Sequence, residues 1–433
     1  MRVEKVNFTI GDSKTEITLF PNGEEVRSKN TFSILIGKNG TFKSSTLKVV
    51  ADFYRKSRKT KDEIIGDVTS IDTPSKVIAI SSTSGDKFAL SQQTVFPSMK
   101  YQAISSDLRY FYFGPKSRSS FSNRFQVQQL MDAVAYGMSS QKTKATILHI
   151  FKDLELYPTL EFVFKKSDKL SKLSDKDARI KINEILEKKL EGNKSLQKRL
   201  EKISKDIFSQ KNGIHFFWDL KTEENYSDML TLINILLGKQ QLQFVDVKLS
   251  KLDLTSFGIN QLSSGEASLL LKFLSLASVV EDNSLILFDE PENSLHPNWQ
   301  ITFLDQFKKV LSSLEGCHVI IATHSPHILS DFKNEDGCVV ELSRDKNKII
   351  GTPIDFEIYG WSVEKILIDI FGIATTRNHY FEMRLRRLLK EIGSTNPSSD
   401  EVSSLIHELE GFAKDRDDPL KNILEEARKT IQL

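Results

Sequence analysis

Short apolar runs punctuate this 433-residue chain and predict where its strands lie. Residues 3–10 and 15–20 alternate apolar and polar side chains on either side of a Gly-containing turn, a pattern that predicts a β-hairpin. Residues 285–288 and 319–322 are instead continuously apolar, and so are residues 33–36 after Ser33, which is typical of strands buried on both faces of a sheet. Further strands are expected at residues 76–81, 109–113, 242–249, 337–342 and 348–353.

Most of the remaining chain has apolar residues at the spacing of an α-helix. Residues 46–58 follow the first buried run, and the apolar stretch LLLKFLSLASVV at residues 269–280 is long enough for a buried helix. The pattern becomes helical from about residue 126, including residues 143–156, and the tail from residue 362 onward is helical throughout. Buried strands that alternate with helices predict an α/β protein.

Residues 165–206 form a charged helical segment. They carry 14 Lys and Arg against 8 Asp and Glu, an excess of +6, while Leu and Ile recur every three to four positions. The break at Gly192-Asn193 predicts two short helices and a turn, not a long coiled coil. The simpler interpretation is an amphipathic arm with a solvated face, and the functional one is an arm that contacts a partner protein or DNA.

Composition and charge exclude several classes of protein. The net charge of +2 is close to neutral, so the overall charge does not argue for nucleic acid. The two cysteines, Cys317 and Cys338, lie in apolar contexts that predict buried thiols in a reducing cytosol. No apolar run approaches the roughly 18 residues that would span a membrane, and the first ten residues lack a signal-peptide core. We therefore expect a cytoplasmic protein without a membrane domain.

The segment GKNGTFKSS directly follows the first buried run. Backbone N–H groups of a Gly-containing turn before a helix can surround phosphate oxygens. Lys43 can reach the β- and γ-phosphates, and the Ser44 hydroxyl suits Mg²⁺. The sequence thus predicts an ATP-binding loop made of Gly37, Lys38, Asn39, Gly40, Thr41, Phe42, Lys43, Ser44 and Ser45.

Polar residues also end the other two buried runs. Asp289 and Glu290 follow residues 285–288; Asp289 suits the Mg²⁺ site, and Glu290 suits a base that orients the attacking water. His324 follows residues 319–322 and could sense or polarise the γ-phosphate.

The order of these segments resembles the ABC-type ATPases. Residues 37–45 correspond to Walker A, the segment Leu-Ser-Ser-Gly-Glu at residues 262–266 to the signature, Asp289-Glu290 to Walker B, and His324 to the switch histidine. The strings DEPENSLHP and THSP are similar to the soluble branch that includes RecF, SMC and overcoming-lysogenisation-defect ATPases. The resemblance implies an ABC-type head with a mixed sheet, formed by residues 1–118 and 242–355. Residues 119–241 are then a helical insertion between Walker A and the signature, and residues 356–433 a helical C-terminal extension.

The resemblance also implies partners. In that family two heads face each other, and the signature of one completes the nucleotide site of the other. Carried over, the signature residues Ser263, Ser264, Gly265 and Glu266 would contact ATP held by a second copy, in a homo-oligomer. The tail that begins Tyr-Gly-Trp-Ser resembles ATPases of two-gene phage-defence systems such as Septu and PARIS. This implies slow ATP hydrolysis that controls a separate nuclease or toxin in bacterial antiviral defence.

Two rival functions remain at this point. A DNA-repair ATPase would bind DNA directly through the charged arm. The ATP-binding subunit of a membrane transporter is disfavoured by the helical tail and by a signature that ends in Glu.

Some positions depart from the family pattern or leave it open. Phe42 stands where the P-loop usually has Gly before the Lys, which indicates either tolerated drift or a slowed ATPase. The glutamine expected at the lobe junction and the A-loop aromatic are not selected by the sequence. The candidates are Gln102, Gln126, Gln128 and Gln129 for the first, and Phe8, Phe20 and Phe32 for the second.

Two other clusters invite a functional interpretation. Asp415 and Asp417 could suggest a nuclease centre, but no apolar strand precedes them, so a helix cap and solvated loop is the expectation. Basic residues interleaved with aromatic ones could contact single-stranded nucleic acid, although a core strand followed by a basic loop explains them as well. They are Arg109, Lys116, Arg118 and Arg124, with Tyr110, Phe111, Tyr112 and Phe121.

Overall fold

A computed structural model divides the chain into two compact units, Met1–Gly360 and Trp361–Leu433. Each unit is described by itself. The residues described are 1–20, 29–55, 66–83, 85–89, 110–115, 130–131, 133–134, 141–153, 155–190, 193–208, 213–222, 226–372, 378–394, 397–412 and 420–432.

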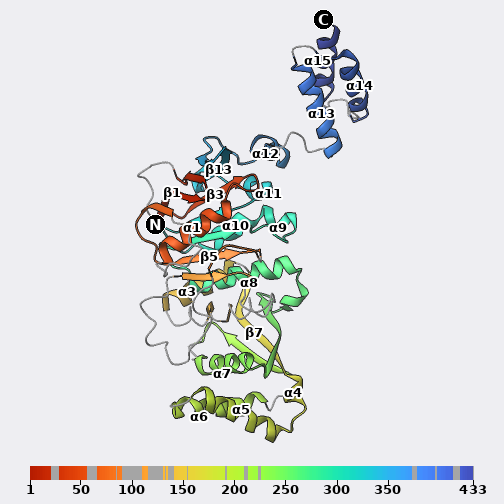
Figure 1. The fold of residues 1–433 in the computed structure, drawn as a ribbon. Helices are drawn as coiled ribbons and strands as arrows, with labels where there is room; N and C mark the ends of the chain where they lie inside the picture. Colours follow the sequence, from red (N-terminus) through yellow and green to blue (C-terminus); the bar gives the residue numbers. More distant parts are fainter. Residues whose placement is uncertain are drawn as a thin grey trace. The chain divides into compact units, whose positions relative to one another are not determined.

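A mixed ten-stranded sheet forms the centre of the first unit (Figure 1). Its strands are β1 (Arg2–Ile10), β2 (Ser13–Thr18), β3 (Thr31–Gly37), β4 (Gly66–Ile71), β5 (Val77–Ser81), β6 (Tyr110–Phe113), β11 (Leu285–Asp289), β12 (His318–Ala322), β13 (Gly337–Asp345) and β14 (Lys348–Pro353). Their order is β4-β1-β2-β14-β13-β3-β12-β11-β5-β6. The strands from β13 to β6 all run parallel, and the hairpins β1–β2 and β13–β14 are antiparallel. The first of these hairpins confirms the prediction for residues 3–10 and 15–20.

Helices cover both faces of this sheet. Side chains alternate between the faces along a strand. Leu285 and Leu287 of β11 therefore share one core with α1 (Lys43–Arg55), whereas the Phe288 ring lies 5.4 Å from that of Phe303 in α10 (Phe303–Val310). Every residue of β11 and β12 is buried, which confirms the prediction from their apolar runs.

A second sheet lies in the segment between Walker A and the signature. Its strands are β7 (Leu156–Lys166), β8 (Ile214–Asp219), β9 (Leu242–Lys251) and β10 (Ser256–Gly258), in the antiparallel order β10-β9-β7-β8. The expected helices surround it: α3 (Gln141–Asp153), α4 (Asp168–Ser171), α5 (Asp175–Lys189), α6 (Lys194–Phe208) and α7 (Ser227–Gly238).

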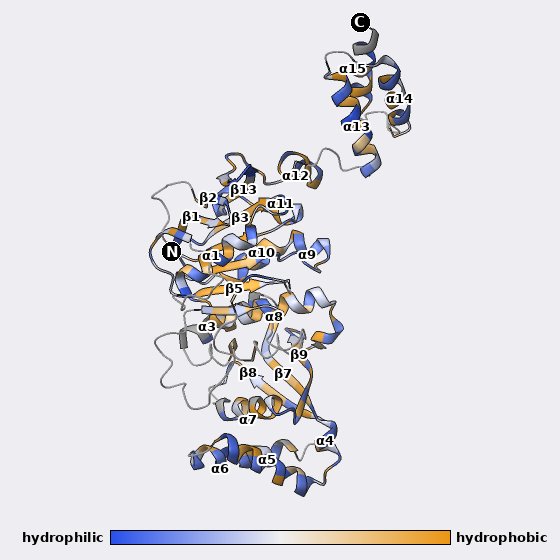
Figure 2. Ribbon diagram, viewed as in Figure 1, coloured by the Kyte–Doolittle hydropathy of each residue, from blue (hydrophilic) through white to orange (hydrophobic). Residues whose placement is uncertain are grey.

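The strands β7 and β8 were not predicted, and they make this insertion a mixture of sheet and helices. Leu156, expected to end a helix, instead begins β7, whose residues alternate between buried and half-buried as in a strand with one face on a core. The helical hairpin expected in residues 165–206 is confirmed as α5 and α6. Figure 2 shows hydrophilic residues along α6 and hydrophobic ones along β5, the strand between β11 and β6.

The second unit is helical, as predicted. It contains α12 (Val363–Asp369), α13 (His379–Ile392), α14 (Ser399–Glu410) and α15 (Leu420–Gln432). The last three pack around one apolar core that includes Phe381, Leu405 and Leu424. In the part of the chain that the structure describes, none of the helices has the length and apolar character needed to cross a membrane.

Candidate nucleotide-binding site

Three neighbouring strands end at the same edge of the large sheet, and each carries one of the predicted motifs. The strand β12 lies between β3 and β11, and Ala322 at its end is in register with both Leu35 and Asp289. The residues that follow these strands therefore start from adjacent positions. In this way Walker A comes together with Walker B and the switch histidine, although more than two hundred residues of chain separate it from them.

Lys43 lies at the centre of the Walker A loop. Its Nζ donates hydrogen bonds to the carbonyl oxygens of Gly37 (2.7 Å) and Lys38 (3.4 Å), and only 6% of the residue is exposed. Burial lowers the pKa of Lys43 to about 8, and the carboxylates of Glu290, Glu292 and Asp289 oppose that shift. A largely desolvated cation of this kind favours an anionic ligand.

The loop itself requires unusual backbone geometry at two positions. A Cβ on Gly37 would lie 2.5 Å from the Leu342 carbonyl oxygen, so no side chain fits there. Phe42 adopts φ +65°, in the left-handed region, and its ring packs against the core that contains α1. A glycine before the lysine would adopt this left-handed φ without strain. The phenylalanine adopts it at a cost in strain, and its ring adds apolar contact with the core.

Ser44 and Asp289 join Walker A to Walker B. The Ser44 hydroxyl donates a hydrogen bond of 2.9 Å to Asp289 Oδ1. Burial raises the pKa of Asp289 to about 7, while this hydrogen bond acts in the opposite direction. A hydroxyl and a carboxylate are oxygen ligands of the kind that Mg²⁺ prefers, and a cation there would offset the cost of ionising the buried carboxyl. The residues present therefore fit a magnesium site.

Glu290 and His324 lie beside this pair. Glu290 has φ +49°, and its backbone N–H donates to the Ala322 carbonyl at 2.9 Å, which ties the end of β11 to the end of β12. His324 is half-buried, and burial, followed by the charge of Lys43, lowers its pKa. The imidazole is therefore neutral near pH 7 and lies within electrostatic reach of the Walker A lysine.

The sequence analysis did not assign a role to Glu292. Its carboxylate accepts hydrogen bonds from the Thr323 hydroxyl (2.8 Å) and from the His324 backbone N–H (2.6 Å). Burial raises the pKa of Glu292. Its presence in the DEPE string was visible in the sequence, but no spacing rule connects it with a histidine 32 residues later.

The signature forms the N-terminus of α8 (Ser264–Val279), which confirms the predicted buried helix. Ser263 and Glu266 make a reciprocal capping box: the Ser263 Oγ accepts from the Glu266 N–H, and the Glu266 carboxylate accepts from the Ser263 N–H at 2.9 Å. The same carboxylate accepts from the Trp299 indole at 2.7 Å. A Cβ on Gly265 would meet the Ser294 carbonyl, so the helix start packs tightly on the loop after Walker B.

Ser263 and Ser264 are exposed. Within the residues described, no hydrogen bond connects the signature to its own Walker A loop. Further along α8, the buried Lys272 donates to the Ser82 hydroxyl at 3.0 Å, and Ser82 follows the strand that neighbours β11. The signature helix is therefore linked to the strand ends, while its own first residues face solvent.

The remaining residues that the sequence singled out have the following positions in the structure. Ser45 is buried and accepts a hydrogen bond from Lys87, whereas Lys38, Asn39 and Gly40 are exposed at the tip of the loop. Phe8 and Phe32 belong to the core, so neither presents a ring at the loop surface. Cys317 and Cys338 are buried free thiols, as predicted. The candidates Gln102, Gln126, Gln128, Gln129, Arg109, Lys116, Arg118, Arg124, Asp415 and Asp417 lie outside the described residues.

Solved structures that match this chain include an SMC head domain from Pyrococcus furiosus, solved with the C-terminal domain of ScpA. It is 10% identical over 82% of this chain and 96% of that one, with a TM-score of 0.31. An ATP-binding cassette of an ABC transporter, MJ1267 in its ADP conformation, is 13% identical over 85% of this chain and 94% of that one, with a TM-score of 0.31.

Two curated proteins are similar in sequence. Protein ea59 of Escherichia phage lambda is 31% identical over 172 residues, 38% of this chain and 32% of that protein. The Septu protein PtuA of Bacillus thuringiensis is 27% identical over 120 residues, 27% of this chain and 30% of that protein. The chain thus spans about a third of the length of these relatives. The match to PtuA confirms the predicted resemblance to Septu-type ATPases. Residues 32–330, more than half of the chain, match the family described as "AAA domain, putative AbiEii toxin, Type IV TA system", and the protein belongs to that family.

Proposed function

We propose that this protein binds ATP with Mg²⁺, hydrolyses it slowly, and works as a pair of facing heads that controls a separate effector. The observation that carries the proposal is the convergence of Lys43, the Ser44–Asp289 pair, Glu290 and His324 at three adjacent strand ends. A buried lysine, two oxygen ligands and a carboxylate next to them are the parts that phosphoryl transfer to water requires.

Each side chain then has a distinct task. Lys43 and the backbone N–H groups of its loop bind the phosphates, and Ser44 with Asp289 holds the metal ion. Bound Mg²⁺ supplies the positive charge that neutralises the phosphate oxygens. Glu290 accepts a proton from the attacking water and orients it. His324, kept neutral by burial and by the charge of Lys43, offers a hydrogen bond to the γ-phosphate region.

The exposed signature supports the pairing of heads. Ser263 and Ser264 begin a 16-residue helix whose first N–H groups and dipole favour an anion, yet they make no hydrogen bond to their own Walker A loop among the described residues. A nucleotide bound to a second copy is the anion that would meet this surface. Each site would then be built from two chains.

The proposal that this protein controls an effector rests on its similarity to known proteins. The match to a Septu protein and the family's link to toxin systems favour bacterial antiviral defence as the setting, with a nuclease or toxin as the partner. The matched segments cover about a third of each relative.

A pair of variants tests the nucleotide site. Lys43→Ala removes the cation and should abolish binding of a fluorescent ATP analogue. Glu290→Gln keeps the shape of the side chain but cannot accept the proton, so binding should persist while phosphate release falls at least a hundredfold. Light scattering should show closed pairs of the Glu290→Gln variant with ATP and Mg²⁺. Equal loss of nucleotide binding in both variants would contradict the assigned roles.

A further inference from the structure

One face of α6 carries a row of lysines. Lys194, Lys198, Lys202 and Lys205 recur at intervals of four, four and three residues, and all four are exposed. At about 100° per residue they fall within an arc of about 80°, so they form one straight stripe. With a rise of about 1.5 Å per residue the stripe is about 17 Å long.

The opposite face of α6 is fixed to the rest of the insertion. Leu196 and Leu200 are buried in the same core as the second sheet. Arg199, at the side of the helix, binds Asp228 of α7 through two hydrogen bonds of 2.6 and 3.2 Å. These contacts fix the rotation of α6 about its axis, so packing holds the lysine stripe facing outward.

The stripe has a single sign of charge. In the part of the chain that the structure describes, none of its four lysines takes part in an ion pair. Glu201 and Asp206 border the stripe, and Glu201 accepts a hydrogen bond from Gln197. The neighbouring helix α5 differs, because its outward residues mix both signs: Lys176, Asp177, Glu184, Glu187 and Lys188 are all exposed.

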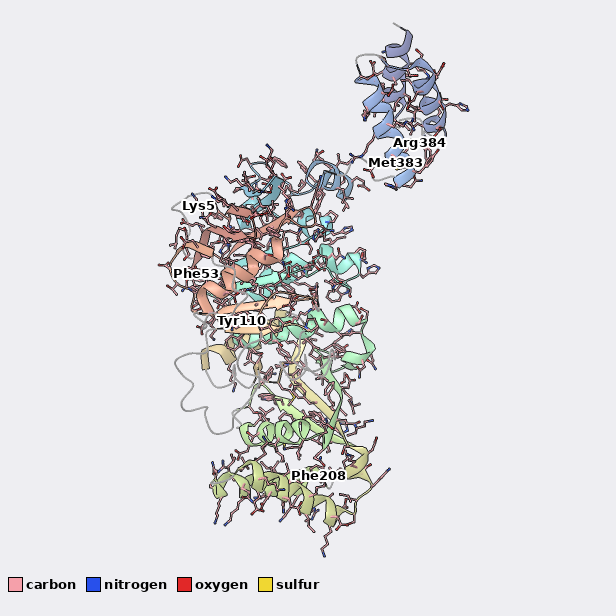
Figure 3. The ribbon with its side chains drawn as sticks, viewed as in Figure 1. Lys5, Phe53, Tyr110, Phe208, Met383 and Arg384 are labelled. Carbon is pink, nitrogen blue, oxygen red and sulfur yellow. The ribbon has the colours of Figure 1, made fainter. Side chains whose placement is uncertain are left out.

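The chemistry of the stripe favours one kind of polyanion. The only aromatic residue of α6 is Phe208, which is 4% exposed (Figure 3), so the stripe offers no ring on which unpaired bases could stack. A lysine ammonium binds phosphate oxygens as a point charge, and contacts to phosphate carry no sequence information. Duplex DNA presents about one phosphate charge per 1.7 Å, or about ten along the length of the stripe.

We propose that the lysine stripe of α6 binds the phosphate backbone of a nucleic-acid duplex without sequence preference. This goes beyond the proposed ATPase function, and it does not depend on that function being correct. The surface would let the ATPase respond to, or be held at, the nucleic acid.

The experiment measures duplex binding of the full chain by fluorescence anisotropy at several salt concentrations. The α6 variant replaces Lys194, Lys198, Lys202 and Lys205 by Gln. The matched control replaces Lys176, Arg179, Lys188 and Lys189 of α5 by Gln, which removes the same charge from the same hairpin. Gln is a good helix former, and circular dichroism checks that both variants keep their helices. The probes are a 20-base-pair DNA, an RNA duplex of equal length, a single-stranded DNA and poly-glutamate.

We expect the unaltered protein to bind a duplex with a steep salt dependence. The α6 variant should bind at least tenfold more weakly at low salt, and its slope of log K against log salt should be smaller by about three to four. The α5 control should stay within about twofold. Comparison of the DNA and RNA duplexes identifies the source of the phosphates.

Three outcomes would overturn the proposal. They are equal weakening of duplex binding in both variants, no duplex binding by the unaltered protein, and a preference for single strands or poly-glutamate. The Lys43→Ala variant should keep duplex binding, so failure of either proposal can be told from failure of the other.

Discussion

The half-buried carboxylate of Glu292 holds the backbone of His324 in place. It accepts a hydrogen bond of 2.6 Å from the His324 N–H and one of 2.8 Å from the Thr323 hydroxyl. These contacts cross from the loop after β11 to the end of β12, and hydrogen bonds to a charged acceptor are stronger than neutral ones. The orientation of the switch histidine therefore depends on a residue that touches neither phosphate nor water in the proposed reaction.

Replacement of Glu292 by Gln tests this positioning role. The amide can keep both partners only if the Thr323 hydroxyl reverses from donor to acceptor, and the bond to the His324 N–H loses the strength that a charged acceptor gives it. We expect kcat to fall about tenfold, with nucleotide affinity nearly unchanged. A double-mutant cycle with His324→Ala, measured by phosphate release, should show strong non-additivity. Independent, additive losses would mean that Glu292 does not act through His324.

The left-handed backbone of Phe42 predicts an unusual order of stabilities. Phe42→Ala and Phe42→Gly both lose the packing of the ring, but only glycine removes the strain of φ +65°. The glycine variant should therefore be more stable than the alanine variant by about 1 kcal/mol, the reverse of the usual order in helices. Urea unfolding of the nucleotide-free proteins measures the difference. An alanine variant at least as stable as the glycine variant would show that the backbone changes conformation there.

Mixing two inactive variants tests whether each site is built from two chains. Ser263→Arg places a bulky cation where the nucleotide of the facing head must fit, and leaves its own Walker A loop intact. Lys43→Ala removes the Walker A cation and leaves the signature intact. In mixed pairs, one of the two composite sites has both parts unaltered, so ATP hydrolysis should reappear on mixing. Mixtures that stay inactive, although mixed pairs form, would contradict the facing arrangement, as would normal hydrolysis by Ser263→Arg alone.

The buried His318 predicts a loss of stability in mild acid. Burial, followed by the positive charges of Arg2 and the N-terminus, lowers its pKa to about 3. The ring is held by the Val3 N–H, which donates to Nδ1, and by the Ser33 hydroxyl, which lies 2.9 Å from Nε2. In the unfolded chain its pKa returns to about 6.5, so below that pH the unfolded state takes up a proton that the native state does not. The stability that the neutral, buried imidazole of His318 contributes is complete above pH 6.5 and is lost as the pH falls toward 3.

At pH 5 this loss amounts to about 2 kcal/mol of unfolding free energy. Urea unfolding at pH 7 and pH 5 measures it, and His318→Gln serves as the comparison because other groups also titrate in this range. The Gln variant should be less stable at pH 7 but should lose less stability between the two values. Parallel losses in both proteins would show that His318 is not the group responsible.

Much of the fold was predictable because its signals are local. The runs at residues 285–288 and 319–322 are apolar throughout and too short for a helix of ordinary length, which is typical of strands buried on both faces, as β11 and β12 are. The helices of the second unit follow from regular spacing of apolar residues. The strands β7 and β8 were missed because they lie between strongly helical segments, and their alternating pattern gains its meaning only when they pair with each other and with β9.

The Walker A loop can be predicted from the chain alone, because its nine residues are contiguous and their chemistry depends on a short turn before a helix. Three other relationships become visible only in the folded protein: Ser44 reaches Asp289, Glu292 holds His324, and the lysines of α6 face outward. The physical reason is that these relationships join strand ends and packed faces far apart along the chain. Their geometry comes from the order of β3, β12 and β11 in the sheet and from the burial of Leu196 and Leu200, neither of which a one-dimensional pattern contains.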